Sequence, residues 1–254
     1  MYTAFASVYD ALMRDVPYED WAAHYLRLLA RYGAAGGKCV ECACGSGALT
    51  IPLKKGGMRV TGVDMSGEML AIAMRKARET GLLIPFVRQD MCELRVPSRV
   101  QAVLATCDGV NYLLTKERLA QFFRAAFGAL KAGGVLLFDV STPYKLLFAL
   151  GDTRTYVAED NAYIWHNRVH PAKKTVDMAL TIFAKRPDGA YERIEEGQTQ
   201  RAFEMDELRG ALTEAGFERI RFFGGMRLSA PREKDMRWHI AAVKPKDTGR
   251  RNDG

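Results

Sequence analysis

The sequence predicts an α/β domain with a doubly wound sheet, and two observations carry this prediction. From Lys38 onward, short apolar runs alternate with segments of helical periodicity. The apolar runs are nearly continuous, which is typical of parallel strands that helices cover on both faces. Right-handed crossovers between such strands produce a doubly wound sheet, whose ligands bind beyond the carboxyl ends of the strands.

The first 140 residues supply most of the expected elements. Residues 1–32 are predicted to form a helical cap, because Trp21, Tyr25 and Leu28 recur at helical spacing and Gly33 follows them. Strands are predicted at 39–43, 58–63, 83–87, 100–106 and 134–140. Helices are predicted through Leu49 and Leu53, at 66–80 and at 116–131.

The pattern changes after Ser141. Strand-like segments at 155–157, 162–169, 175–184 and 191–203, with a turn at 187–189, predict an antiparallel β insertion after the fifth strand. A helix at 206–215 and strands at 217–223 and 237–243 then return to the sheet. The expected organisation is a core of residues 1–140 and 204–244, an insertion at 141–203 that serves as a substrate lid or an oligomer contact, and a basic tail at 245–254.

Composition narrows the classes of function. The chain is 26% charged and 48% hydrophobic, and no apolar run approaches the roughly 18 residues of a membrane span. The N-terminus lacks the features of a signal peptide, so a cytoplasmic protein without a membrane partner is expected. The formal charge of +7 suggests nucleic acid, but part of it lies in the tail and the other basic residues are scattered. Nucleic acid is therefore an unfavoured partner, and a monomer or homodimer is expected.

Five cysteines, three of them at Cys39, Cys42 and Cys44, raise the question of a metal site. Cys39 and Cys42 have opposite parity along a predicted strand and would point to opposite faces of the sheet. No nearby histidine or second cysteine pair completes a tetrahedral ligand set. No metal is expected, and the thiols are predicted to be small buried side chains.

The turn after the first predicted strand carries the strongest functional signal. Gly45 and Gly47 allow tight turns and the close approach of a ligand, but Thr50 stands where a dinucleotide fingerprint requires a third small residue. Glu41, just before the turn, would repel a pyrophosphate and could pair with the ammonium group of a methionine moiety. Asp64, at the end of the second strand, is positioned to accept hydrogen bonds from ribose hydroxyls. Together these residues favour S-adenosylmethionine (SAM) as the cofactor.

The same segments, with two later ones, resemble the motifs of class I SAM-dependent methyltransferases. The matching segments are 40–47, 62–66 with Met69 and Leu70, 89–91, and 107–112. In that family they are the first two motifs, the adenine-contacting motif and the donor–acceptor motif. The resemblance spans roughly residues 38–140. It implies a Rossmann-like methyltransferase sheet, SAM as the cofactor and S-adenosyl-L-homocysteine as the product.

This resemblance and the positions at strand ends give a set of residues expected to bind the cofactor. They are Tyr9, Glu41, Ala43, Cys44, Gly45, Gly47, Asp64, Met65, Met69, Asp90, Met91 and Cys107. By the resemblance, the Asp90 side chain would meet the adenine amino group, with the Met91 backbone beside it. Ala43 stands where many members of the family carry glycine. Tyr9 either closes over the cofactor or packs within the helical cap.

A looser resemblance extends to both sides of the core. The N-terminal segment 5–21 and the antiparallel insertion look like those of a bacterial subgroup that methylates small molecules. That subgroup often carries a histidine where this chain has Gln198. The difference leaves the identity of the acceptor and the role of Gln198 open.

The expected reaction requires few catalytic groups. A sulfonium methyl group is already electrophilic, so alignment of the nucleophile supplies much of the acceleration. A neutral amine needs little help from a base, whereas a hydroxyl must lose its proton. Asn111 and Tyr112 are the expected residues on the acceptor side, and His166 in the insertion is the candidate base.

Three hypotheses about function follow. The first is a SAM-dependent methyltransferase that acts on the N or O atom of a small-molecule acceptor. The second is a non-catalytic SAM-binding or interaction module, because a fold and a cofactor pocket do not guarantee an acceptor site. The third is a nucleic-acid methyltransferase, which only the positive charge suggests. Segment 108–112 lacks the proline-containing stretch that is usual in enzymes that methylate nucleobase amino groups.

Overall fold

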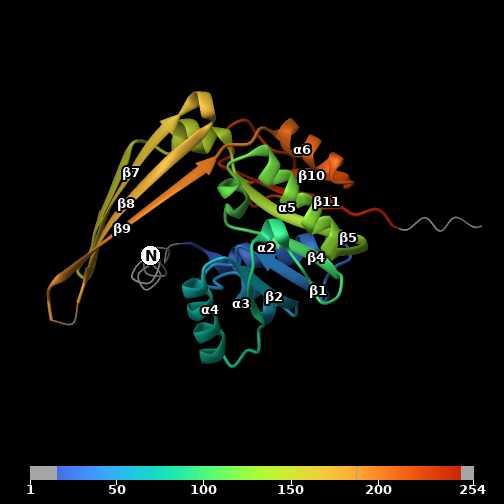
Figure 1. The fold of residues 1–254 in the computed structure, drawn as a ribbon, viewed down its shortest axis with the longest axis horizontal. Helices are drawn as coiled ribbons and strands as arrows, with labels where there is room; N and C mark the ends of the chain where they lie inside the picture. The colour runs from blue at the N-terminus through green and yellow to red at the C-terminus, as the bar shows by residue number, and fades with distance from the viewer. Residues whose placement is uncertain (1–15, 187, 247–254) are drawn as a thin grey trace, which may run out of the picture.

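A mixed sheet of seven strands, with helices on both faces, forms the centre of the molecule (Figure 1). The structure, a computed structural model, describes residues 16–186 and 188–246. The strand order is β10-β11-β5-β4-β1-β2-β3. Strands β1 to β5 pair in parallel, whereas β11 is antiparallel to both of its neighbours. The predicted α/β fold with a doubly wound sheet is confirmed.

Each element of this core occupies one continuous segment. The strands are β1 (Lys38–Cys42), β2 (Arg59–Asp64), β3 (Phe86–Arg88), β4 (Val100–Ala105), β5 (Leu130–Ser141), β10 (Glu218–Gly224) and β11 (Arg237–Val243). The helices are α2 (Tyr18–Arg31), α3 (Thr50–Lys55), α4 (Gly67–Glu79), α5 (Lys116–Ala129) and α6 (Met205–Glu214). Short helical turns η1 (Met91–Glu93) and η2 (Gly109–Tyr112) follow β3 and β4.

Two boundaries differ most from the prediction. The sequence predicts a strand at 83–87, whereas β3 begins only at Phe86, beside Gly62 of β2. The sequence also predicts a helix at 116–131, whereas α5 ends at Ala129. Strand β5 begins at Leu130, which pairs with Val100. Pairing between residues so far apart in the chain overrides local periodicity, which carries no information about it.

The alternation of side chains along the strands produces two apolar cores. Helices α5 and α6 cover one face of the sheet, and Phe122 and Leu208 belong to the core on that face. Helices α2 and α3 cover the other face, where Leu28 packs. Cys42 lies in the first core and Cys39 in the second, and all three clustered cysteines are buried. The two thiols therefore point to opposite faces, as their parity predicts.

The N-terminal cap is described from residue 16 onward. Within it, α2 begins after Pro17, which fixes the chain direction at the helix start. The predicted helical character is therefore present at 18–31, while Tyr9 and the rest of 1–15 lie outside the described residues.

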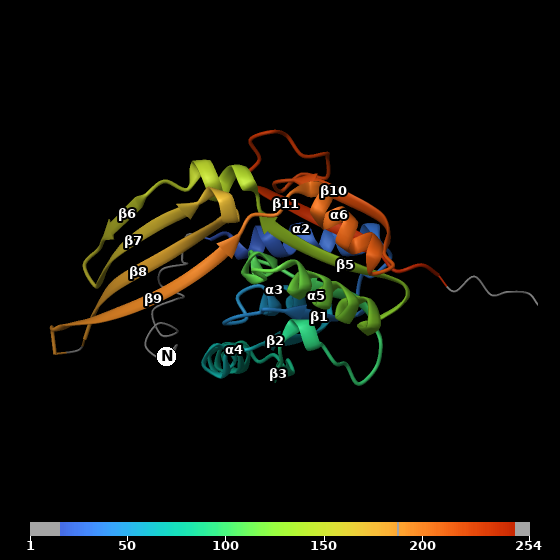
Figure 2. The same cartoon turned by 45° about the horizontal axis from the view of Figure 1, so that its top comes forward.

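The insertion forms a separate antiparallel sheet that extends away from the central sheet (Figures 1 and 2). Its strands are β6 (Thr153–Val157), β7 (Asn161–His170), β8 (Thr175–Lys185) and β9 (Tyr191–Arg201), in that order. A short π-helix, η3 (Lys145–Ala149), connects β5 to it. Leu146 and Leu150 pack with Val176 and Met178 of β8, so this side of the sheet is the inner face, turned toward the core.

The fully buried carboxylate of Asp139 joins four parts of the chain. It accepts hydrogen bonds from the Tyr25 hydroxyl at 2.6 Å and from the backbone N–H groups of Cys107 and Asp108, each at 2.9 Å. The guanidinium of Arg237 also donates to it. One side chain of β5 thus fastens α2, the loop after β4 and the start of β11 to each other.

We expect Tyr25→Phe to lower the free energy of unfolding by about 1.5–3 kcal/mol, because a buried carboxylate loses a hydrogen-bond donor. Tyr32→Phe is the matched control, since its ring is half-buried and its hydroxyl bonds to no carboxylate among the described residues. It should cost less than about 0.5 kcal/mol. Urea denaturation of the three proteins measures the difference, and equal effects of the two substitutions would show that Asp139 does not depend on this hydroxyl.

Two buried histidines lie beside this carboxylate. The rings of His24 and His239 are fully buried, with their centroids 4.5 Å apart. The Nε2 atom of each has no hydrogen-bond partner among the described residues. Nδ1 of His239 lies 3.3 Å from the Tyr25 hydroxyl. Burial lowers the pKa of both histidines from 6.5 to about 4, so both are neutral in the folded protein near neutral pH.

Stability should therefore fall as pH falls from about 6.5 toward about 4, because in this range the unfolded chain binds protons that the folded chain does not. Urea unfolding across this range measures the slope. In the double variant His24→Gln/His239→Gln, the free energy of unfolding should depend less steeply on pH. NMR titration of the two rings in the unaltered protein gives a direct check, and a ring that titrates near pH 6.5 would contradict the assignment.

Candidate cofactor and acceptor site

The loop after β1 adopts the backbone conformation that its glycines permit. Gly45 and Gly47 have φ values of +54° and +73°, in the left-handed region. A Cβ atom on Gly47 would lie 3.0 Å from the Cβ of Ala73, so this glycine lets α4 pack against the loop. A Cβ atom on Gly45 would meet nothing within 4 Å, so the loop borders open space there. That space is where the expected cofactor would lie.

Asp64 connects this loop to the start of α4. Its Oδ2 accepts from the backbone N–H of Gly45 at 2.8 Å, and its Oδ1 accepts from that of Ser66 at 2.9 Å. Ser66 in turn caps α4, because its hydroxyl oxygen accepts from the N–H of Met69. Each carboxylate oxygen of Asp64 retains a second lone pair. Both oxygens can therefore accept a further hydrogen bond from a ligand hydroxyl.

Glu41 is buried below the loop. Its carboxylate accepts hydrogen bonds from the hydroxyls of Thr50 at 2.5 Å and Thr106 at 2.8 Å. These contacts join α3 to the end of β4. Burial raises the pKa of Glu41 to about 7, although the two hydroxyls oppose the shift. A cationic group bound nearby would favour the ionised form of this carboxylate.

Asp90 follows β3 and is held from two sides. Oδ2 accepts from the Arg118 guanidinium at 2.5 Å, and Oδ1 accepts from the N–H of Cys92 at 2.9 Å. Burial alone would raise the pKa of Asp90, but these two donors lower it below its ordinary value. The carboxylate is thus ionised and fixed at the carboxyl edge of the sheet, on the same side as Asp64.

The loop after β4 contains two consecutive non-glycine residues in the left-handed region, Cys107 at φ +56° and Asp108 at φ +65°. Such a conformation costs roughly 1–3 kcal/mol per residue and persists only where its surroundings impose it. Here the two N–H groups both point to the carboxylate of Asp139. The Asp108 side chain is held by Arg237 at 2.5 Å and by the hydroxyl of Ser141 at 2.7 Å.

The electrostatics of this loop follow from its neighbours. Burial alone would raise the pKa of Asp108, but the Arg237 guanidinium, Lys145 and the Ser141 hydroxyl together outweigh burial and hold the pKa well below its ordinary value. Lys145 donates to the Ser141 hydroxyl at 2.8 Å and lies 3.8 Å from the Asp108 carboxylate. Burial lowers the pKa of Lys145, and Asp108 partly opposes that shift.

Asn111, an expected acceptor-side residue, is fully buried. Its amide nitrogen donates to the carbonyl oxygens of Ser141 and Arg201, and its amide oxygen accepts from the N–H of Ser141. These bonds hold β5, β9 and the η2 loop together. Asn111 is therefore a positioning residue in this structure, and no acceptor contact is assigned to it.

Tyr112 of the core contacts Gln198 of the insertion. The Tyr112 hydroxyl donates to Oε1 of Gln198 at 2.6 Å, and the Tyr112 side chain is 43% exposed. Gln198 lies on the inner face, because it pairs with Met178. The sequence singles out both residues but does not show that they touch.

His166, the candidate base, lies on the opposite face of the insertion. In an antiparallel sheet, paired residues point to the same side and neighbouring residues to opposite sides. His166 pairs with Ala179, whereas Asn167 pairs with Met178 and so shares the face of Gln198. The exposed ring of His166 contacts the Thr153 hydroxyl at 2.9 Å. The structure thus places His166 on the face opposite to Gln198, the partner of Tyr112, and its role as a base stays a prediction.

The remaining expected cofactor residues surround the two loops. Met65 is 62% exposed at the end of β2, while Met69, Met91 and Cys44 are buried. An exposed methionine next to Asp64, the open space at Gly45 and the unused lone pairs of Asp64 together fit an adenosyl ligand. Asp64 would hold its ribose hydroxyls, and the backbone around Gly45 would lie along it.

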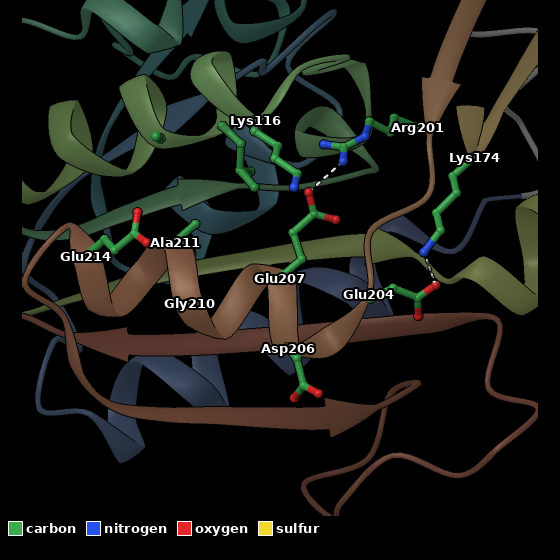
Figure 3. A pocket seen from close by; sticks show the side chains of 11 residues that line it. Lys116, Lys174, Arg201, Glu204, Asp206, Glu207, Gly210, Ala211 and Glu214 are labelled. Carbon is green, nitrogen blue, oxygen red and sulfur yellow. Dashed lines mark hydrogen bonds and ion pairs between the residues drawn. The ribbon is translucent and has the colours of Figure 1, made fainter. Parts of the chain in front are cut away.

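A separate hollow of about 530 Å³ lies between α5, α6 and the end of β9 (Figure 3). Two ion pairs lie among its charged side chains, Arg201 with Glu207 at 2.5 Å and Lys174 with Glu204 at 2.8 Å. The Nη1 atom of Arg201 has no hydrogen-bond partner among the described residues. The Arg201 guanidinium also lies 4.6 Å from the centre of the Phe203 ring. These contacts join the insertion to the core, and the hollow is distinct from the cofactor loops.

Within residues 16–186 and 188–246, no three His, Cys, Asp or Glu side chains gather in a way that could hold a metal ion. None of the helices in those ranges combines the length and the apolar character needed to cross a bilayer.

Several residues of this site escaped the sequence analysis. Asp139, Arg237 and Lys145 form a charged network behind the loop after β4, which is called the donor–acceptor loop below. Arg118 holds Asp90. A usable signal existed only for Asp139, an acidic residue within a run that otherwise reads as a buried strand. The others lie far from the loop in sequence and carry no local pattern.

Comparison with known proteins agrees with this geometry. Residues 39–134 match the family model described as a methyltransferase domain. A protein of Geobacillus sp. (strain WCH70), which is named as a methyltransferase without a stated substrate, is 38% identical over 96% of this chain and 99% of its own length.

Solved structures share the fold. A SAM-dependent methyltransferase from Clostridium acetobutylicum ATCC 824 superposes with a TM-score of 0.86 at 26% identity, covering 96% of this chain and 99% of the other. The sugar N-methyltransferase of Streptoalloteichus sp. ATCC 53650 superposes with a TM-score of 0.77 at 21% identity, covering 94% and 93%. The likeness to the second protein is one of fold. The chain belongs to the class I SAM-dependent methyltransferases, and SAM is its cofactor.

Proposed function

We propose that this methyltransferase transfers the methyl group of SAM to a nitrogen or oxygen atom of a small molecule. The acceptor would bind between the inner face of the insertion and the carboxyl edge of the central sheet. The observation that carries the proposal is the 2.6 Å hydrogen bond from Tyr112 to Gln198, which fastens the insertion over the donor–acceptor loop. The neighbouring bond from Asn111 to the Arg201 carbonyl supports the same closure.

The cofactor roles follow from the contacts already described. Asp64 would hold the ribose hydroxyls while it keeps the Gly45 loop in place. Glu41, with a pKa of about 7, would become ionised beside the ammonium group of the methionine moiety. Asp90, held by Arg118, would face the adenine amino group. The Gly45 loop would lie along the cofactor, with the exposed Met65 covering its edge.

When bound, SAM supplies an electrophilic methyl group on a sulfonium. The protein's task is then to align the acceptor and to exclude water, which can account for several kcal/mol of the barrier. Tyr112 is the side chain best placed to touch the acceptor, because it is partly exposed and joins the core to the insertion. An amine acceptor fits this arrangement without a base, and the shared fold with a sugar N-methyltransferase supports an amine or hydroxyl acceptor.

Incubation of the enzyme with methyl-labelled SAM and the small-molecule fraction of a bacterial extract tests this function. Label should appear in a low-mass product. Tyr112→Phe should lower that transfer about 10- to 100-fold, because the hydrogen bond to Gln198 is lost and the acceptor is misaligned. Tyr191→Phe is the matched control, since it removes a hydroxyl that bonds to the Glu159 carbonyl at the far end of the insertion. Label found only in nucleic acid, or equal loss in both variants, would contradict the proposal.

The cofactor site is tested separately by calorimetry with S-adenosyl-L-homocysteine. We expect Asp64→Ala to weaken binding at least about tenfold, because a charged acceptor for ribose and two loop contacts are lost. Glu79→Gln, at the exposed C-terminal end of α4, should bind as the unaltered protein does. Unchanged affinity in Asp64→Ala would show that another group holds the ribose.

A further inference from the structure

A pair of cationic side chains lies at the edge of the proposed acceptor site. Arg154 is on the inner face of the insertion, because it pairs with Trp165, two residues from Asn167 on the same side. Lys145 lies on η3, which packs against that face through Leu146. The Arg154 guanidinium is close enough to Lys145 to help lower the pKa of the ammonium group, after burial and Arg237.

The Arg154 guanidinium has more N–H donors than the one that bonds within the protein. Its Nε donates to the carbonyl of Leu150 at 3.2 Å. In the described part of the chain, no carboxylate forms an ion pair with it. A guanidinium has five N–H groups in a fixed fork, and such a fork matches the two oxygens of a carboxylate or a phosphate. The terminal nitrogens of Arg154 are thus available for an anion.

The charges around Lys145 do not cancel. Its surroundings include Asp108 and Asp139 as carboxylates, and Arg237 and Arg154 as cations. Counting Lys145 itself, these described residues comprise three cationic groups and two carboxylates. The only acidic side chain in the row of Arg154, Trp165 and Leu180 is Glu196, which lies three strands away, about 14 Å at the usual strand spacing.

We propose that the acceptor carries an anionic group, a carboxylate or a phosphate, which Arg154 and Lys145 bind. This inference rests on the proposed function and names the chemical class of the acceptor. Lys145 is linked through the Ser141 hydroxyl to Asp108, so the anion would be held next to the donor–acceptor loop. Trp165 and Leu180, beside Arg154 in the same row, provide an apolar surface for the rest of the acceptor.

Titration of small probes into the protein saturated with S-adenosyl-L-homocysteine tests this inference. Benzoate should bind saturably, and benzamide, its neutral counterpart, should bind at least about tenfold more weakly. Arg154→Gln should weaken benzoate binding about tenfold, and Lys145→Gln should also weaken benzoate binding. Arg168→Gln is the matched control, because Arg168 lies on β7 but on the outer face, opposite Asp177. It should leave benzoate binding unchanged.

Competition between inorganic phosphate and benzoate identifies the anion. If phosphate binds more tightly and loses more affinity in Arg154→Gln, the acceptor carries a phosphate. If benzoate does, the acceptor carries a carboxylate. The inference is overturned if benzamide binds as well as benzoate, if Arg154→Gln and Arg168→Gln behave alike, or if benzoate does not bind. Failure of the cofactor product to bind in the first step would instead count against the cofactor site itself, so the two failures are distinguishable.

Discussion

The buried carboxylate of Asp139 is the constraint on which this site depends. It is the common acceptor for Tyr25 of α2, for the backbone of Cys107 and Asp108, and for Arg237 of β11. A carboxylate buried among apolar strands is stable only when its oxygens are paired. Because the donors come from three separate segments, satisfying this charge also sets the shape of the loop after β4.

The strained conformation of that loop has consequences further out. With two residues held in the left-handed region, Asp108 turns toward Arg237 and Ser141, and η2 is carried to the end of β5. From there Asn111 bonds to the backbone of β9, and Tyr112 reaches Gln198. A series of contacts that begins at the buried carboxylate of Asp139 thus joins the insertion to the carboxyl edge of the central sheet. The ion pairs around Arg201 reinforce the joint from the other side.

Comparison of expectation with structure shows where sequence reasoning succeeds. The Gly45 loop and Asp64 lie together because a strand, a turn and a strand end are close in sequence and follow rules of local geometry. The opposite faces of Cys39 and Cys42 follow from strand parity alone. His166 is a different case, because the sequence does not predict which face of the insertion it occupies. Its parity relative to Gln198 depends on the register of two hairpins, and a shift of one residue would reverse its face.

The sequence by itself determined the fold class and the cofactor and predicted the loop that would hold it, because periodicity, glycine positions and acids at strand ends are local properties. The tertiary structure decided which side chains meet. Asp139 and Arg237 are 98 residues apart, and Tyr112 and Gln198 are 86 apart. It also decided that Asn111 is a buried link and that Arg154 lies on the inner face of the insertion. Such contacts depend on how strands pair and on which face each side chain occupies, and no local pattern encodes either.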